Sequence, residues 1–157
     1  MNGHHLYKAT IQWTGNKGTG TSNYKDYERS HTISIENKGD IQSSSDPAFR
    51  GDNTKHNPED LFLASLSSCH MLWYLHLCSE AGVIVLDYTD HATGTMEETA
   101  NGGGRFTEVI LNPIVIVKEA SMIMKAEELH HKANELCFIA NSVNFRVLHN
   151  PTIKLVG

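Results

Sequence analysis

The chain has 157 residues, of which 39% are hydrophobic and 20% are charged, with a net charge of -5 at pH 7 and a pI near 6.0. This length and composition fit a single globular domain over residues 1–157 and argue against wholesale disorder. The thirteen Lys and Arg are scattered along the sequence, so no basic surface for a nucleic acid is expected.

The N-terminal sequence "MNGHHLYKATIQWTG" lacks the basic, apolar and small-residue regions of a secretory signal, so we expect a cytoplasmic protein. Three cysteines are too few for a disulfide scaffold, and cytosolic proteins seldom use structural disulfides. The most apolar segment, residues 61–78, is interrupted by polar side chains and is not expected to cross a membrane: Ser65, Ser67, Ser68, His70 and His76.

Alternating residues predict a first β-hairpin over residues 6–36. Tyr7, Ala9, Ile11 and Trp13 share one face of its first strand, a glycine-rich turn follows, and "HTISIEN" forms the return strand. Residues 37–58 are polar and show no periodicity. We expect them to form a long loop, which in a compact domain is more often functional or partner-bound than idle.

A helix is predicted to begin at Asn57 as the N-cap, with Pro58 in the first helical position, and to end near Gly82. The carboxylates of Glu59 and Asp60 in its first turn interact favourably with the positive end of the helix dipole. Almost no charged face follows between residues 61 and 78, so we expect this helix to be enclosed on nearly every side. One small domain has difficulty enclosing a helix completely, which favours a second subunit.

The C-terminal half of the sequence predicts two strand-rich segments over residues 82–96 and 104–119, joined by a hairpin loop. A second helix is predicted over residues 121–143, with Ser121 as a plausible cap. Its apolar positions are Met122, Ile123, Ala126, Leu129, Ala133, Leu136 and Cys137 or Ala140. Residues 151–157 form a final edge strand. The predicted fold class is α+β, with two long helices against antiparallel sheet.

The three cysteines allow several interpretations. Cys69 and Cys78 cannot form a disulfide within one helix, because nine residues separate their Cα atoms by about 13 Å. Cys69 can meet Cys137 only if the two helices pack together. From spacing alone, all three cysteines are most simply buried packing residues.

A metal site is not expected: His70 and His76 are six residues apart, and the adjacent His130 and His131 diverge around the helix.

The segment "NPEDLFLASLSSCHM", followed by a second helix that contains "ELCFIANSV", resembles the osmotically induced / organic hydroperoxide resistance (OsmC/Ohr) family of bacterial thiol-dependent peroxidases. The resemblance extends over most of the chain. It implies the OsmC-like fold, in which the antiparallel sheets of an intertwined homodimer wrap around two long central helices. It implies no cofactor and no metal.

The same resemblance implies roles for individual residues. Cys69 matches the peroxidatic cysteine, whose thiolate attacks the hydroperoxide and becomes a sulfenic acid. Cys137 matches the resolving cysteine that condenses with it to a disulfide, which an external dithiol, such as a lipoylated protein, then reduces. Glu59 matches the carboxylate that pairs with an arginine beside the thiolate.

The sequence departs from the family at that arginine. In the hydroperoxide-resistance branch the arginine lies in the glycine-rich turn after the first strand, whereas this turn carries Lys17. A guanidinium is needed because an apolar helix raises the pKa of a thiol, and only the thiolate is a competent nucleophile. Arg50 in the long loop is the first substitute and Arg29 the second. Glu59 lies about 15 Å from Cys69 along the helix, so it must act through an arginine or on the other subunit.

The remaining residues near Cys69 have simpler interpretations. His70 is expected to be a core or interface histidine, Cys78 inert packing, and Trp73 a core residue that could line a pocket for an alkyl chain. The first function hypothesis is a peroxidase for organic hydroperoxides. The second is an OsmC-like fold with lost or altered activity that acts as a stress-related small-molecule binding protein. The third is a cysteine hydrolase that uses Cys69 with His70 or His131, for which no third group or oxyanion hole is evident.

Overall fold

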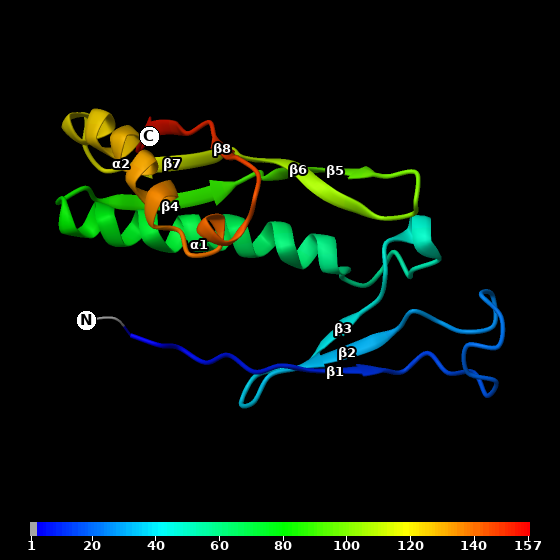
Figure 1. Cartoon of the computed structure of the whole chain (residues 1–157). Coiled ribbons are helices and arrows are strands. Elements are labelled where there is room, and N and C mark those ends of the chain that lie inside the picture. The colour runs from blue at the N-terminus through cyan, green and yellow to red at the C-terminus, as the bar shows by residue number, and fades with distance from the viewer. Residues whose placement is uncertain (1–2) are drawn as a thin grey trace. The chain divides into compact units, whose positions relative to one another are not determined.

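The computed structural model describes residues 3–157, and its contacts divide the chain into two compact units, which meet at the boundary between Leu61 and Phe62. The long helix α1 (Pro58–Glu80) begins in the first unit, and all but its first turn belongs to the second. Figure 1 gives the element order. Each unit is described below by itself.

The first unit contains a three-stranded antiparallel sheet of β1 (Thr10–Trp13), β2 (His31–Ser34) and β3 (Ile41–Ser43), in that order. Ile33 of β2 lies opposite Ile11 on one side and Ile41 on the other. The predicted hairpin is therefore confirmed. In the turn between β1 and β2, the Asn16 side chain accepts hydrogen bonds from the backbone N–H groups of Gly18 and Gly20, both of which have positive φ.

The prediction of an unstructured loop over residues 37–58 is wrong. The segment contains β3 and a short 3-10 helix, η1 (Pro47–Phe49), whose first turn is capped when Asp46 accepts from the N–H of Ala48 at 2.7 Å. The backbone at Gly51 lies so close to Ser45 that a Cβ added at Gly51 would overlap the carbonyl group of Ser45. The three-residue β3 has no periodicity of its own, because its partner β2 supplies the hydrogen bonds that define it.

The predicted ends of α1 are confirmed by capping interactions. The Asn57 side chain accepts from the N–H of Asp60 at 2.8 Å, and the Asp60 carboxylate accepts from the N–H of Asn57 at 3.2 Å. At the other end the N–H of Val83 donates to the carbonyl of Cys78, and Gly82 has a φ of 72°. This is the Schellman arrangement that a glycine permits after the last helical residue.

The second unit contains two three-stranded sheets. In one, β7 (Pro113–Val117) lies between antiparallel β4 (Val85–Asp90) and parallel β9 (Thr152–Leu155). In the other, β6 (Gly104–Leu111) lies between antiparallel β5 (Thr93–Glu98) and parallel β8 (Val147–His149). The hairpin between β5 and β6 and the edge strand β9 are confirmed. The sequence analysis did not predict β8.

Helix α2 (Ile123–Leu136) is shorter than the predicted helix. Residues before it form a 3-10 turn, η2 (Ala120–Met122), and residues after it form another, η3 (Ala140–Ser142). The predicted cap at Ser121 is wrong, since no side chain caps this end. The helix ends at Cys137, which has extended backbone angles. The predicted apolar face is confirmed, because Ala126, Leu129 and Ala133 are buried.

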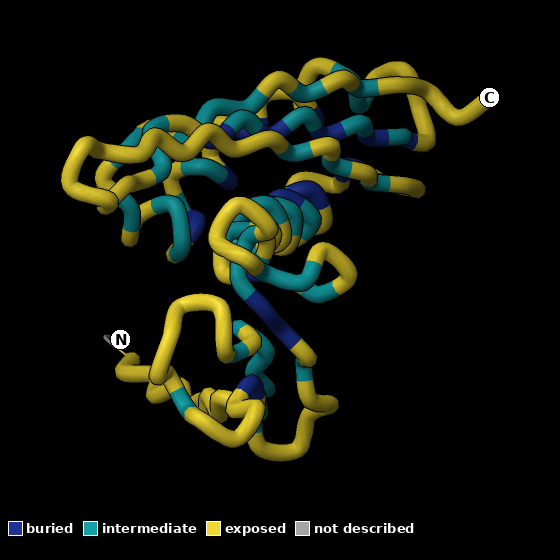
Figure 2. Tube along the Cα trace, turned by 90° about the vertical axis from the view of Figure 1, so that its right-hand side faces the viewer, coloured by how far each residue is buried: buried dark blue, intermediate teal, exposed yellow. Residues whose placement is uncertain are grey.

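Within the second unit the core lies between α1 and the strands. A stripe of α1 at every fourth residue is buried: Leu66, His70, Tyr74 and Cys78. Figure 2 shows this dark blue side of the helix facing the strands. Leu66 packs with residues of β6, and Tyr74 and Cys78 pack with residues of β7 and α2. The fold is α+β, as predicted, with mixed sheets where purely antiparallel ones were expected.

The single chain does not enclose α1 on every side, and its enclosure by a second subunit stays a prediction. Leu72 on the opposite face is 63% exposed, and Ala64, Ser68 and His76 are exposed as well. By length and composition alone α1 could cross a membrane. Its polar side chains are instead bonded within the unit: Ser67 donates to Asp90, and His70 shares a hydrogen bond with His130. These contacts show that one face of α1 packs against other elements of the second unit.

Candidate functional site

The structure brings Cys69 and Cys137 together. Cys69 is half-buried in the middle of α1, and Cys137 is buried at the residue where α2 ends. The two thiols are free, and they lie close enough for Cys69 to contribute to the raised pKa of Cys137. The N–H of Ala140 donates to Sγ of Cys137 at 3.4 Å, so the turn after α2 fixes the position of this sulfur. Cys69 and Cys137 therefore come from the two helices that the sequence requires for a redox pair, and their redox roles remain predictions.

The two thiols have different environments. Burial, followed by the hydrogen bond with Cys69, raises the pKa of Cys137 to about 11, while the N–H of Ala140 acts in the opposite direction. Cys137 therefore keeps its proton near pH 7. Cys69 is more exposed than its partner, so it is the sulfur that an external reagent can approach first.

An apolar surface adjoins the thiol pair. Trp73 follows Cys69 by one helical turn, Phe138 follows Cys137 directly, and their rings meet edge to face at 5.5 Å. Phe138 is 69% exposed. Trp73 also lines a hollow of about 320 Å³ with Leu72 and His76. Trp73 is thus only half-buried, consistent with the interpretation that it lines a surface for an alkyl group.

A cluster of buried histidines, which the sequence did not predict, lies beside Cys69. Nε2 of His70 and Nδ1 of His130 share a hydrogen bond of 2.9 Å, although the residues are 60 positions apart. His130 stacks on Tyr74 with 3.9 Å between ring centroids, and His149 stacks on His70 at 5.7 Å. Among residues 3–157, Nδ1 of His70 and Nε2 of His130 have no hydrogen-bond partner. The expectation that His70 is a core histidine is confirmed.

Burial keeps this histidine cluster uncharged. Burial first, and the neighbouring imidazoles second, lower the pKa of His70 to about 4 and that of His130 to about 3. His130 points into the core, whereas the adjacent His131 is exposed, so they diverge as predicted. In the part of the chain that the structure describes, no group of three or more His, Cys, Asp and Glu is arranged to hold a metal ion.

Cys78 lies away from the thiol pair in the core between α1, β7 and α2. It is 1% exposed, and burial raises the pKa of its thiol. These surroundings are those of a packing residue, as predicted. The contacts of His70 and His131 do not favour a hydrolase, since His70 is hydrogen-bonded to His130 and His131 meets His149 edge to face.

The remaining predicted site residues belong to the first unit. Arg50 is exposed at the end of η1, where its φ is 65°, and its guanidinium lies 5.9 Å from the ring centroid of Tyr24. Arg29 is held more firmly, because it donates to the carbonyls of Tyr27 and Tyr24 at 2.7 and 2.8 Å and lies over both rings. Neither arginine forms an ion pair with a described carboxylate.

Glu59 is half-buried in the first turn of α1, where Asp60 and not Glu59 makes the capping bond. Lys17, which stands in the turn that carries the arginine in the hydroperoxide-resistance branch, lies 3.5 Å from Glu28 on the surface. Of the predicted site residues, the structure therefore brings together Cys69 and Cys137. The roles of Arg50, Arg29 and Glu59 remain predictions.

Comparison with known proteins agrees with this geometry. The family described as OsmC-like protein matches residues 51–151. An OsmC-like protein of unknown function from Vibrio cholerae is similar in structure with a TM-score of 0.85 and 30% identity, covering 95% of this chain and 100% of that chain. No curated protein matches significantly.

Two more distant structures share the fold. An organic hydroperoxide resistance protein from Elizabethkingia anophelis has a TM-score of 0.71 at 20% identity and covers 99% of this chain and 100% of its own. An organic hydroperoxide resistance protein OsmC from Legionella pneumophila has a TM-score of 0.70 at 16% identity, with 97% and 98% covered. With the family match over residues 51–151 and the similarity to the Vibrio cholerae protein, these findings show that the chain belongs to the OsmC-like protein family.

Proposed function

We propose that this protein is a thiol-dependent peroxidase that reduces organic hydroperoxides to alcohols. The observation that carries the proposal is the pair of free thiols, Cys69 and Cys137, which lie close enough for Cys69 to contribute to the raised pKa of Cys137. A half-exposed sulfur next to a buried one suits a two-step reaction in which the first sulfur meets the substrate and the second resolves the product. Membership of a family that includes organic hydroperoxide resistance proteins supports the same reaction class.

In the first step the thiolate of Cys69 attacks the distal oxygen of the hydroperoxide and the O–O bond breaks. The sulfur becomes a sulfenic acid, and the alkoxide takes a proton and leaves as the alcohol. In the second step the sulfur of Cys137 attacks the sulfenic sulfur, a disulfide forms and water leaves. An external dithiol, for which a lipoylated protein is one candidate, returns two electrons by thiol–disulfide exchange. The apolar surface of Trp73 and Phe138 favours hydroperoxides that carry an alkyl or aryl group.

A guanidinium is proposed to stabilise the Cys69 thiolate. Arg50 keeps its predicted role, and Arg29 is the alternative with the better-fixed guanidinium. Glu59 is proposed to orient that arginine. Removing a guanidinium that lies against a thiolate raises the thiol pKa by about 1–3 units. The rate of alkylation of Cys69 against pH, measured for Arg50→Met and Arg29→Met, identifies the residue, and unchanged profiles for both variants contradict the role.

A homodimer in the cytoplasm is proposed as the working form. Leu72, which is 63% exposed, lies on the face of α1 that the single chain leaves uncovered, and a second copy would bury this side chain. Free thiols fit a reducing compartment. Light scattering during size-exclusion chromatography tests the dimer, and a mass of 17.5 kDa at micromolar concentration contradicts it.

The activity is tested by stopped-flow reduction of cumene hydroperoxide with a small dithiol as electron donor. We expect Cys69→Ser to lose all turnover, Cys137→Ser to retain one oxidation of Cys69 without a disulfide, and the matched control Cys78→Ser to remain active. Mass spectrometry of peroxide-treated protein should detect a Cys69–Cys137 bridge. Turnover that survives Cys69→Ser, or a bridge that includes Cys78, contradicts the proposed mechanism.

A second candidate is an OsmC-like protein whose activity is lost or altered and which binds a stress-related small molecule. The observation that favours it is the glycine-rich turn, which contains no arginine and whose Lys17 is paired with Glu28 on the surface. A folded protein that shows neither turnover nor peroxide-dependent oxidation of Cys69 would select this candidate.

A further inference from the structure

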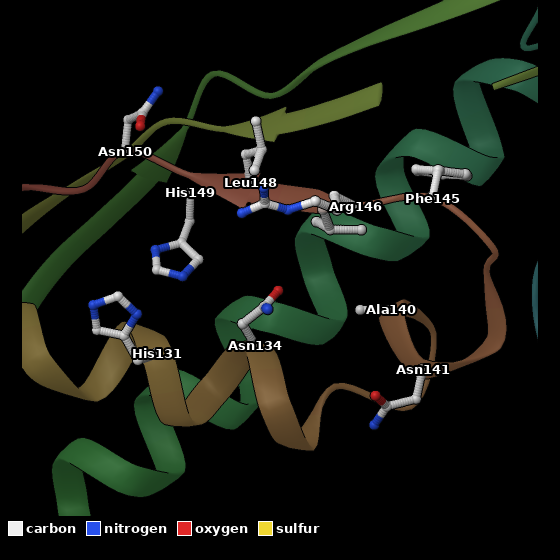
Figure 3. A pocket seen from close by; sticks show the side chains of 10 residues that line it. His131, Asn134, Ala140, Asn141, Phe145, Arg146, Leu148, His149 and Asn150 are labelled. Atoms are coloured by element: carbon white, nitrogen blue, oxygen red, sulfur yellow. The ribbon is translucent and has the colours of Figure 1, made fainter. Parts of the chain in front are cut away.

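A cavity of about 490 Å³ lies in the second unit between the C-terminal part of α2 and the segment around β8. Figure 3 shows His131 and Asn134 on α2 facing Arg146 and His149 on the segment around β8. The turn that follows Cys137 closes one side. This volume lies within the usual range of small-molecule sites. The proposed peroxidase reaction uses none of these four side chains.

The cavity carries one fixed positive charge. Arg146 is the only Lys or Arg that lines it, no Asp or Glu lines it, and no ion pair is found for Arg146 among residues 3–157. Burial and the neighbouring His131 lower the pKa of His149, so this imidazole is uncharged near pH 7. A guanidinium without a carboxylate partner at the wall of a cavity is suited to binding an anion from solution.

Two buried polar atoms beside the cavity also lack partners. Oδ1 of Asn134 and Nδ1 of His149 have no hydrogen bond to any of residues 3–157. An unpaired buried polar atom costs free energy, and native structures rarely retain one without a reason. Both residues line the cavity that Arg146 lines, so one ligand could satisfy all three. The side chains of Phe145 and Leu148 add apolar wall.

We propose that this cavity binds a small organic carboxylate. The carboxylate is held by the planar fork of Arg146, a polar group of the ligand bonds with Asn134 and His149, and its hydrocarbon part lies against Phe145 and Leu148. A single guanidinium matches one negative charge and the two oxygens of a carboxylate. A phosphate dianion would require more positive charge than the cavity supplies. The proposal is independent of the peroxidase reaction.

The proposal is tested by isothermal titration calorimetry at pH 7.5 with benzoate, 4-hydroxybenzoate, hippurate and succinate, and with benzamide and inorganic phosphate for comparison. We expect at least one carboxylate to bind at one site per chain, and benzamide and phosphate to bind at least 10-fold more weakly. Because a charge-assisted bidentate hydrogen bond is lost, Arg146→Met should weaken the binding of that carboxylate about 10- to 100-fold. Asn134→Leu should weaken it less.

The matched control is Arg105→Met. Arg105 is exposed and lines a neighbouring cavity of about 410 Å³, whose wall also includes Arg146, but it does not line the proposed site. This variant should bind the carboxylate with unchanged affinity. Equal losses in Arg105→Met and Arg146→Met would assign the ligand to the neighbouring cavity and overturn the proposal. So would tighter binding of phosphate, unchanged binding in Arg146→Met, or no binding of any of the four carboxylates at 10 mM.

Discussion

Cys69 and Cys78 lie on the same helix, nine residues apart, in similar apolar sequence, yet their environments differ completely. Cys78 is 1% exposed in the core with Tyr74, and Cys69 is half-buried beside the thiol of Cys137. Part of the difference comes from α1 itself: Cys78 belongs to the buried stripe of the helix, and nine residues at about 100° each place Cys69 on the opposite side. The neighbouring elements supply the rest, because α2 and β7 pack against Cys78, whereas the residue that ends α2, Cys137, lies near Cys69.

The largest expected effect is on chemical accessibility. Under native conditions at pH 8, iodoacetamide should label Cys69 at least about 100-fold faster than Cys78, because labelling of Cys78 requires unfolding that costs several kcal/mol. Peptide mass spectrometry over a time course measures both rates. In 6 M guanidinium the labelling rates of Cys69 and Cys78 should become equal. Equal rates in the native protein would contradict the difference in their accessibility.

The histidine cluster between these two cysteines should make stability depend on pH. The pKa values of His70 and His130 are about 4 and about 3 in the folded chain, below the usual value of 6.5. As the pH falls below about 6.5 the unfolded chain binds protons that the folded chain does not. The free energy of unfolding therefore decreases, by up to about 1.4 kcal/mol per pH unit for each histidine, until the folded pKa is reached.

Urea unfolding at pH 7.5, 6.5, 5.5 and 4.5 measures this dependence. His130→Phe, which keeps a ring for the stack on Tyr74, should reduce the slope below pH 6.5 by about one proton. His91→Gln changes an exposed histidine of the same unit and is the matched control. An unchanged slope in His130→Phe would show that this imidazole is not kept neutral by the fold.

Stability and activity should respond in opposite ways at the two cysteines. Cys78→Ala removes a sulfur from a close-packed core and should lower the free energy of unfolding by about 1–2 kcal/mol without loss of peroxide turnover. Cys69→Ala should lower it by less than about 0.5 kcal/mol, because this side chain is half-exposed. Urea denaturation of both variants provides the measurement, and a larger cost at Cys69 contradicts the assignment of Cys78 to packing.

The smallest expected effect concerns the start of the helix. Asn57→Ala removes the reciprocal hydrogen bonds with Asp60 and should cost about 1 kcal/mol. Glu59→Gln changes the same turn without removing a cap and should cost only a few tenths. Fraying at this end should raise the labelling rate of Cys69 more than that of Cys78, which lies about two and a half turns further from the cap.

Local chemistry made α1 and the β5–β6 hairpin predictable from the sequence. Both ends of α1 depend on interactions over a few residues: the cap at Asn57, the proline after it and the positive φ of Gly82. Such short-range signals can be read directly from the sequence. The short strands β3 and β8 were missed because three residues are too few to show the alternating pattern of a strand. Their hydrogen bonds come from β2 and β6, which lie elsewhere in the sequence. Asn141 and Ser142 in the predicted second helix lie instead in a 3-10 turn.

The sequence by itself determined the fold class, the position of the helix that carries Cys69, and the resemblance that pairs Cys69 with Cys137. Only the tertiary structure decided which cysteine is sealed in the core, brought His70 against His130, and placed Arg146 at a cavity without a carboxylate. Helix ends and hairpins depend on interactions between near neighbours. Burial, pKa values and cavities depend on which distant segments share a surface, and sequence spacing does not encode that directly.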